Sequence, residues 1–153
     1  MHKWVFLFLW LVGSVVYSEA PIKYAKEFTE YCEDYNVPTW IMSRLIEYES
    51  GWNPYVVNEN KNGSVDEGIC QLNSAYIKDF ERMYNMGLPI NTFDWRQNLR
   101  MGIKHLRYLY DLTGSWWSAV ASYNMGYYGW LRWCRGERSL PTATKKELDF
   151  IFR

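Results

Sequence analysis

The segment between Asp94 and Gly114 is the feature that most limits the folds this chain can adopt. Its apolar side chains recur every three or four residues, the spacing that places them on one face of a helix. They are Leu99, Ile103, Leu106, Leu109 and Tyr110. Asp94 with Gln97 three residues later is a partial capping box, and Gly114 is a helix stop signal. The sequence therefore predicts a long helix whose apolar face other elements must cover.

Helical signals also dominate the other parts of the chain. Residues 22–34 carry apolar residues at helical spacing, and Pro38 opens a second helix that should end near Ser50 and Gly51. Further helices are predicted for residues 74–84, for residues 116–123 after a capping Ser115, and for a terminal segment in which Thr144 and Glu147 form a capping box.

The segments between these helices carry loop signals. Residues 53–64 are rich in Asn, Gly and Lys, and they predict a loop or a small hairpin with Asn62 and Gly63 at its turn. Residues 86–91 predict a loop, and Gly126 and Gly129 are expected to interrupt helical structure. The expected fold is a single, mainly α domain with a small hairpin.

The amino-terminal segment is predicted to lie outside this domain. Residues 4–16, WVFLFLWLVGSVV, form an apolar run of 13 residues that follows Lys3 and precedes the polar Ser18. This pattern is typical of a secretory signal peptide and is short for a membrane span. We expect residues 1–18 to be a signal peptide cleaved after Ser18, and residues 21–153 to form the domain. An uncleaved membrane anchor is the alternative.

Charge and cysteine content exclude several classes of function. The chain has 17 basic and 17 acidic residues, so nothing indicates the basic patch of a nucleic-acid-binding protein. The spacing of its three cysteines fits no zinc pattern, and no metal or cofactor is implied. Cys70, between the apolar Ile69 and Leu72, is interpreted as a small buried hydrophobe. Cys32 and Cys134 are the one candidate pair for a disulfide.

Several short blocks, in order along the chain, carry a family resemblance. They are Glu49-Ser50 near a helix end, Asn53-Pro54, Gly68-Ile-Cys-Gln71, Tyr123-Asn124 within ASYNMGYYGW, and Leu140-Pro141 before the last helix. These blocks resemble the soluble lytic transglycosylase (SLT) family of bacterial cell walls, within the lysozyme-like superfamily. The block Asn62-Gly-Ser-Val-Asp66 is also similar to small transglycosylases that accompany secretion machines and to c-type lysozymes. The resemblance covers roughly residues 36–152. Cys70, Ser122 and Met125 depart from the family pattern.

This resemblance implies a fold, a substrate and a location. It implies a lysozyme-like α+β fold with the hairpin beside an active-site cleft, and an exported, monomeric protein of the periplasm or cell envelope. Its partner would be the glycan strand of peptidoglycan, with a secretion or flagellar machine as a further candidate. The implied reaction cleaves the β-1,4 bond from N-acetylmuramic acid to N-acetylglucosamine and leaves a 1,6-anhydro end. A hydrolytic muramidase and a non-catalytic glycan-binding or assembly protein are the alternatives.

The resemblance also assigns roles to individual residues. Glu49 matches the catalytic acid, whereas Glu47, two residues away and so on another helix face, is expected to be solvated. An acid that works near neutral pH needs an apolar surround that raises its pKa, and Tyr48 and Trp52 are candidates for it. Asp66 is interpreted either as a second catalytic carboxylate or as an anchor of the hairpin. The remaining predicted site residues, expected to bind substrate or fix the cleft, are Ser50, Gln71, Tyr123 and Asn124.

Overall fold

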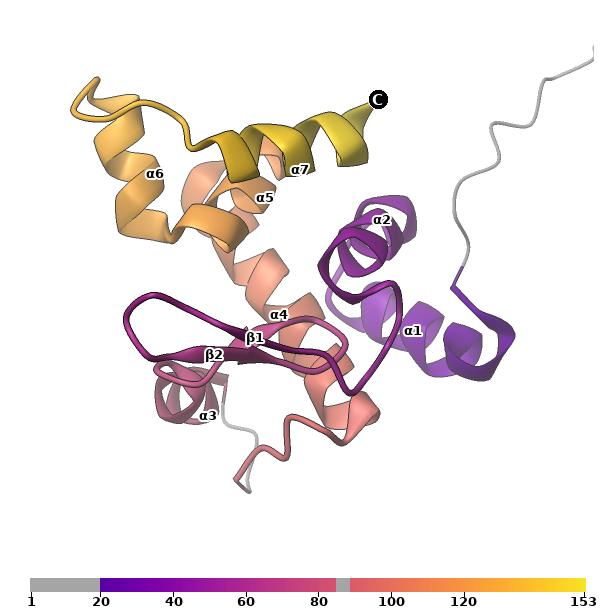
Figure 1. The fold of residues 1–153 in the computed structure, drawn as a ribbon. Helices are drawn as coiled ribbons and strands as arrows, with labels where there is room; N and C mark the ends of the chain where they lie inside the picture. Colours follow the sequence, from indigo (N-terminus) through magenta and orange to yellow (C-terminus); the bar gives the residue numbers. More distant parts are fainter. Residues whose placement is uncertain (1–19, 85–88) are drawn as a thin grey trace, which may run out of the picture.

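The computed structural model describes residues 20–84 and 89–153, and in these ranges it has seven helices and three short strands (Figure 1). The predicted signal peptide, residues 1–18, lies outside the described residues, as do residues 85–88. The helices are α1 Ile22–Asp34, α2 Thr39–Ser50, α3 Ile77–Tyr84, α4 Trp95–Thr113, α5 Trp116–Met125, α6 Tyr127–Cys134 and α7 Thr142–Phe152. The strands are β1 Val57–Glu59, β2 Val65–Glu67 and β3 Leu72–Asn73. The predicted fold class, mainly α with a small hairpin, is confirmed.

Helix α4 runs through the middle of the molecule, where α1, α3 and α5 pack against it (Figure 1). Its predicted apolar face is buried, and Leu99, Ile103 and Leu106 are fully excluded from solvent. The capping residue Asp94 accepts hydrogen bonds from the amides of the first turn, and the Gln97 side chain donates to it at 3.0 Å. The local signals at both ends therefore place the helix as expected.

The three strands form an antiparallel sheet of order β1-β2-β3. Asp66 lies on the middle strand, opposite Asn58 on one side and Asn73 on the other. The turn between β1 and β2 contains the predicted Asn62 and Gly63, and Gly63 adopts a left-handed φ of 81°. The turn signal thus located the hairpin, and a third short strand extends it.

A buried amide fixes this sheet to α4. Asn98 accepts a hydrogen bond from the Cys70 backbone N–H at 2.8 Å, and its own Nδ2 donates to the carbonyl oxygens of Glu67 and Thr92. Gly68, with a φ of 79°, allows this contact, since a Cβ there would overlap the Asn98 side chain. The turn after β2 is therefore held against the central helix by hydrogen bonds of a fully buried side chain.

A second glycine permits the same close approach. At Gly102, in the interior of α4, a Cβ would lie 2.5 Å from both Cβ and Sγ of Cys70. Glycine weakens a helix interior relative to alanine, so the close packing of the turn against α4 offsets that cost here. Cys70 is fully buried, as the sequence predicted.

The structure corrects three local predictions. Gly129 does not interrupt the chain but lies inside α6. Thr144 and Glu147 are not a capping box, because α7 begins two residues before Thr144 and both side chains are buried within it. The helix predicted for residues 74–84 begins only at Ile77.

The predicted pairing of Cys32 with Cys134 is wrong. Both thiols are free, as is that of Cys70. Cys32 is buried in α1, whereas Cys134 is exposed at the end of α6 on the opposite side of the molecule (Figure 1). Within residues 20–84 and 89–153, none of the helices combines the length and apolarity that crossing a membrane requires.

Replacing Asn98 with alanine should destabilise the domain by about 2–3 kcal/mol, because each buried backbone group left without a partner costs about 1–3 kcal/mol. Urea unfolding measures this difference. The exposed Lys146→Ala should stay within about 0.5 kcal/mol of wild type. Equal stability of the two variants would contradict the role given to Asn98.

Candidate active site

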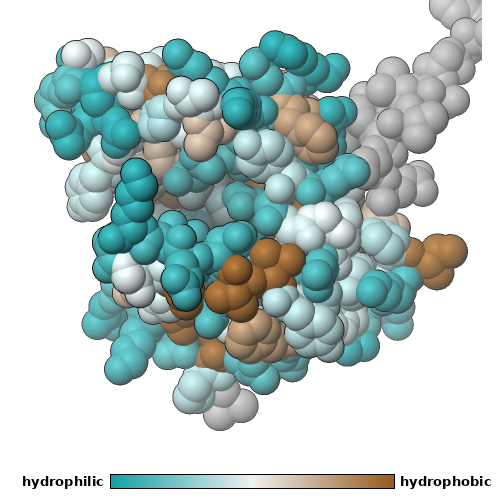
Figure 2. Space-filling view, viewed as in Figure 1, coloured by the Kyte–Doolittle hydropathy of each residue, from teal (hydrophilic) through white to brown (hydrophobic). Residues whose placement is uncertain are grey.

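A cavity of about 880 Å³ lies between the sheet and α3 on one side and α5 and α6 on the other. Figure 2 shows the surface hollowed between these two parts of the molecule. Five of the predicted site residues line this cavity: Glu49, Asp66, Gln71, Tyr123 and Asn124. Residues from four separate stretches of the chain therefore meet at one site.

Glu49 enters the cavity from the last turn of α2. Its pKa is raised to about 7, mainly by burial and then by the negative charge of Asp66. Among the described residues no cation forms an ion pair with it. Glu47, two residues earlier, is exposed, as predicted. A carboxyl that titrates near neutral pH can both give and take a proton at the pH of most cells.

Trp52 does not provide the apolar surround predicted for this acid. Its ring stacks on Tyr24 with centroids 5.8 Å apart and meets Phe28 edge-on at 5.2 Å. Trp52 therefore packs into the core against α1, and it does not line the cavity of Glu49. The desolvation that raises the pKa of Glu49 comes from the burial of its carboxyl at the end of α2.

A second glutamate lies beside the first. Glu147 of α7 is fully buried, and its carboxyl lies beside that of Glu49 and the amide of Asn124. Neither of its oxygens makes a hydrogen bond of ordinary geometry with a described residue. Burial and the nearby Glu49 raise the pKa of Glu147 to about 9, so it carries a proton at neutral pH. Its spacing from Thr144 matched a capping box, and only the depth of α7 in the fold reveals its place.

Both carboxylate oxygens of Asp66 are engaged by the sheet. Oδ1 accepts a hydrogen bond from Asn73 at 2.7 Å, and Oδ2 accepts one from Asn60 at 2.9 Å. Asp66 nevertheless lines the cavity, and its charge acts on Glu49. The geometry therefore gives Asp66 an anchoring role in the hairpin and an electrostatic influence on the acid.

Gln71 is held by its own turn. Its backbone is left-handed, with φ 52°, and its Nε2 donates to the carbonyl oxygens of Gly68 and Val56. Its Oε1 accepts from Asn58 at 2.7 Å. Because its amide is satisfied by these bonds, Gln71 forms a rigid part of the cavity wall.

Ser50 is placed beneath the site rather than in it. Its hydroxyl donates to the carbonyl oxygen of Ile69 at 2.7 Å, and its side chain does not line the cavity. The prediction that Ser50 binds substrate therefore finds no support in the geometry. Its bond ties the end of α2, and with it Glu49, to the turn that Asn98 holds.

Tyr123 and Asn124 contribute the α5 side of the site. The Tyr123 hydroxyl donates to the Cys70 carbonyl oxygen at 2.8 Å, and its ring lies against His105, with centroids 5.4 Å apart. Burial lowers the pKa of His105 to about 4, so this imidazole is neutral at pH 7. Asn124 accepts a hydrogen bond from Thr144 at 2.6 Å. These bonds fix α5 to the turn and to α7 around the two glutamates.

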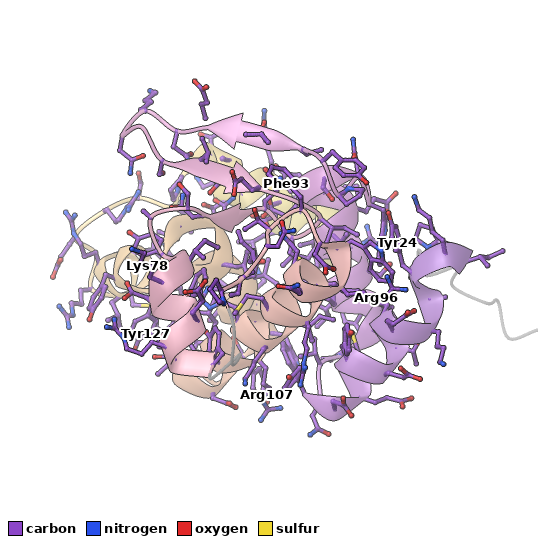
Figure 3. All side chains as sticks on the ribbon, turned by 90° about the horizontal axis from the view of Figure 1, so that it is seen from below. Tyr24, Lys78, Phe93, Arg96, Arg107 and Tyr127 are labelled. Carbon is purple, nitrogen blue, oxygen red and sulfur yellow. The ribbon has the colours of Figure 1, made fainter. Side chains whose placement is uncertain are left out.

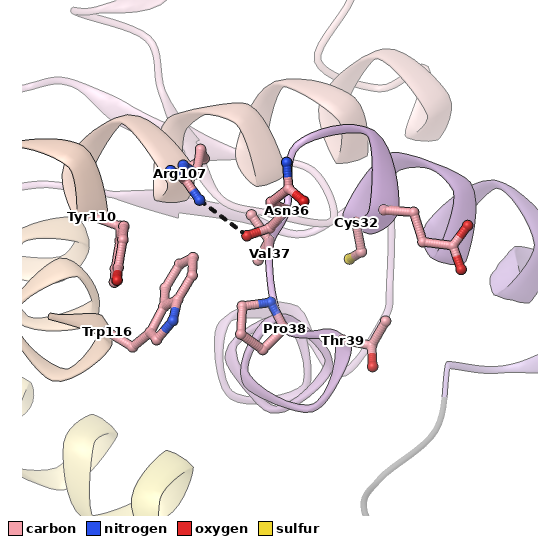
Figure 4. Close-up of a pocket in the computed structure, with 9 residues that line it drawn as sticks. Cys32, Asn36, Val37, Pro38, Thr39, Arg107, Tyr110 and Trp116 are labelled. Atoms are coloured by element: carbon pink, nitrogen blue, oxygen red, sulfur yellow. Dashed lines mark hydrogen bonds between the residues drawn. The ribbon is translucent and has the colours of Figure 1, made fainter.

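A second cavity, of about 560 Å³, lies at the connection between α1 and α2 (Figure 4). Arg107 donates a hydrogen bond across it to the Asn36 carbonyl oxygen at 3.3 Å, and Tyr110 stacks on Trp116 at its edge. None of the predicted site residues lines it. In the part of the chain that the structure describes, no group of three or more His, Cys, Asp or Glu side chains is arranged to hold a metal ion.

Comparison with known protein families gives a match over most of the domain. Residues 26–145 match the transglycosylase SLT domain. This range includes the predicted site residues of the cavity and ends just before Glu147.

Two bacterial proteins are similar in sequence. Protein IpgF of Shigella sonnei is 35% identical over 96 residues, which are 61% of this chain and 61% of IpgF. Invasion protein IagB of Salmonella typhimurium strain SL1344 is 25% identical over 129 residues, 82% of this chain and 74% of IagB.

The fold also matches a solved structure. The 70-kDa soluble lytic transglycosylase in complex with bulgecin A superposes with a TM-score of 0.70 over 86% of this chain, at 20% identity. The match covers only 23% of that much longer protein. At this identity the likeness establishes the lysozyme-like SLT fold alone, as the sequence analysis expected.

Replacing Glu147 with glutamine should flatten the pH dependence of stability. A pKa of about 9 in the folded state, against an ordinary value of 4.5, means that unfolding releases a proton between these pH values. The free energy of unfolding of wild type should thus fall as pH rises through this window, by at most about 1.4 kcal/mol per pH unit for each proton. In Glu147→Gln this contribution is lost, whereas the smaller one of Glu49 and the opposing one of His105, whose pKa is lowered to about 4, remain.

Urea unfolding at pH 5, 7 and 9 tests this expectation. The exposed Glu47→Gln is the matched control and should keep the wild-type slope. Parallel profiles for wild type and Glu147→Gln would show that Glu147 ionises normally in the folded protein.

Proposed function

Because the chain belongs to the transglycosylase SLT domain family, we propose that it is a lytic transglycosylase that cleaves the glycan strands of peptidoglycan. The observation that carries this proposal is Glu49, a carboxyl without a cationic partner among the described residues, in a cavity large enough for a glycan. A glutamate kept only for stability would normally be paired or solvated. The chain spans 61% of IpgF and about a fifth of the solved soluble transglycosylase, so their activities are carried over only as part of this proposal.

The proposed reaction uses Glu49 twice. It first protonates the oxygen that leaves when the β-1,4 bond from N-acetylmuramic acid to N-acetylglucosamine breaks. The resulting carboxylate then takes the proton of the muramic acid C6 hydroxyl, and the C6 oxygen bonds to C1 to close a 1,6-anhydro ring. A pKa of about 7 suits a group that must be an acid in one step and a base in the next. The tethered hydroxyl can have an effective molarity of roughly 10⁵ M or more, which favours it over water.

Glu147 supports this chemistry as a positioning residue. It does not line the cavity, so it would not touch the glycan. Protonated at neutral pH, it offers an O–H beside the Glu49 carboxyl, which favours the carboxylate form and counteracts the increase in pKa that burial causes. This contact therefore opposes part of the increase in the pKa of Glu49 that burial and Asp66 cause.

A hydrolytic muramidase is the second candidate. It is favoured by one observation, that Asp66 faces the same cavity as Glu49 and acts on it electrostatically. The two hydrogen bonds from Asn60 and Asn73 support the other role, because they tie the Asp66 side chain to the neighbouring parts of the sheet through both of its oxygens. We therefore assign Asp66 to the hairpin and to the tuning of Glu49.

The proposed substrate also requires a location outside the cytoplasm. The apolar run at residues 4–16 supports export, and peptidoglycan places the mature domain in the periplasm or cell envelope. IagB is named an invasion protein, and a secretion machine that must pass the wall would need local cleavage of this kind. We propose such a machine as the partner of this chain.

Glu49→Gln should reduce turnover of purified peptidoglycan by roughly 10²–10⁴-fold, because it removes the transferable proton and keeps the shape. Binding of glycan strands, measured by sedimentation with peptidoglycan, should persist. Glu47→Gln, a matched change on the exposed face, should retain wild-type turnover. Full activity of Glu49→Gln would show that Glu49 is not the acid in either enzymatic candidate, whereas a wild type that binds strands without any turnover would leave a glycan-binding protein.

The products distinguish the two enzymes. Mass spectrometry should find 1,6-anhydro ends, lighter by one water than reducing ends. Asp66→Asn should lose less than the roughly 10²-fold expected for a catalytic carboxylate. Its alkaline loss of activity should shift to lower pH, because Asp66 contributes to the raised pKa of Glu49. Reducing ends alone, together with an inactive but folded Asp66→Asn protein, would make the chain a muramidase.

A further inference from the structure

The charged side chains that line the active-site cavity are separated by sign. The sheet and α3 contribute the acidic residues Asp66 and Asp79. Helix α6 and the segment after it contribute the basic residues Arg132 and Arg138. In Figure 3, Lys78 of α3 and Tyr127 of α6 lie on the same side of the molecule, where these two walls face each other. A ligand in the cavity therefore meets positive charge mainly on the α6 wall.

Arg138 is the arginine of this wall that is free to bind a ligand. Arg132 and Arg135 both lie near Glu137, at 3.6 and 3.9 Å. Arg138 makes no ion pair with any residue in the described part of the chain, although it lines the cavity. Its guanidinium can thus present two parallel N–H donors to a planar anion such as a carboxylate.

Gly129 makes room for this guanidinium. A Cβ at Gly129 would lie 3.1 Å from Nη1 of Arg138, tighter than an ordinary contact. Gly129 is inside α6, where glycine lowers helix stability. Its φ is not positive, so its backbone conformation does not require glycine. Gly129 therefore leaves the exposed guanidinium of Arg138 room to lie against α6 at the cavity wall.

The neighbouring side chains suit a sugar. Tyr127 and Tyr128 line the same wall, and Tyr128 is 80% exposed. An exposed aromatic ring on a cavity wall is a surface on which a sugar ring can stack, whereas the arginine beside it selects negative charge. Together they fit a glycan that carries a carboxylate at a short distance from the sugar.

We propose that Arg138, positioned by Gly129, binds a carboxylate of the short peptide that muramic acid carries, and that the enzyme thereby prefers peptide-bearing glycan strands. This inference rests on the proposed function. It adds the chemical class of the side branch that the site recognises, a peptide with a free carboxylate. The peptide is attached through the lactyl group of muramic acid and has free carboxylates, whereas the glycan backbone is uncharged. A basic wall facing this branch would also orient the strand in the cavity.

The experiment compares three substrates. The first is peptide-bearing strands, the second the same strands with their carboxylates converted to amides, and the third strands treated with an amidase. The amidase removes the peptide but leaves the lactyl carboxylate on each muramic acid. Arg138→Gln should raise KM for the first substrate by about three- to tenfold with kcat unchanged, since a partly exposed charged contact is lost. It should change KM for the other two by less than about twofold.

Matched variants show whether the effect belongs to Arg138. Arg135→Gln removes the same charge three residues away, outside the cavity, and should leave all three KM values unchanged. Gly129→Ala favours the helix but crowds the guanidinium, so it should raise KM for peptide-bearing strands alone. Arg138→Lys should recover part of the loss, because it restores the charge without the planar fork.

Three results would overturn the proposal. The first is an equal change in KM for Arg138→Gln and Arg135→Gln. The second is an equal change in KM for Arg138→Gln on strands with free and with amidated carboxylates. The third is an increase in KM for Arg138→Gln that persists on amidase-treated strands. Binding of the three substrates to the Glu49→Gln protein gives a readout that does not depend on turnover. If peptide-bearing strands bind through Arg138 but wild type cleaves none of them, the proposed function fails while this inference stands.

Discussion

The hydrogen bonds of one buried amide, that of Asn98, are the contact on which the geometry of the site depends. They hold the turn after β2 against α4, and that turn is where the other elements converge. Ser50 ties the end of α2 to Ile69, and Tyr123 ties α5 to Cys70. The position of Glu49 is therefore fixed from three helices at once, through two adjacent peptide groups. Such preorganisation suits the proton transfer that we propose for Glu49, because small displacements of an acid are costly to a reaction.

The electrostatics of the site follow from the same convergence. Glu49, Glu147 and Asp66 come from α2, α7 and the sheet, and the domain closes around them without supplying a cation to Glu49 from the described residues. Burial and the neighbouring carboxyl group raise the pKa of Glu147 to about 9, and burial and the charge of Asp66 raise that of Glu49 to about 7, so Glu147 keeps its proton at neutral pH while Glu49 titrates there. The fold thus sets the pKa values of Glu49 and Glu147 through burial and neighbouring charge. In its described part no group of side chains is arranged to hold a metal ion.

Local signals predicted the elements that local interactions determine. Asp94 and Gly114 defined α4, and Gly63 located the hairpin, because caps and turns act within a few residues. Glu147 could not be found in this way, since its spacing from Thr144 is that of a capping box and its role arises from packing against α2 and α5. Gly129 was predicted to interrupt the helix because glycine is a local breaker signal, whereas it lies inside α6 beside the guanidinium of Arg138, a contact that the local sequence does not indicate.

The contact between Gly102 and Cys70 makes the geometry of the candidate active site depend on a residue in the middle of α4. The Cβ that any larger residue would add at position 102 meets the Cβ of residue 70, whatever side chain position 70 carries beyond that atom. Substitution at 102 must therefore displace the turn, and with it the anchors of α2 and α5. Position 102 therefore constrains the position of Glu49, although Gly102 does not line the cavity. Lineages that keep this turn should inherit the glycine with it.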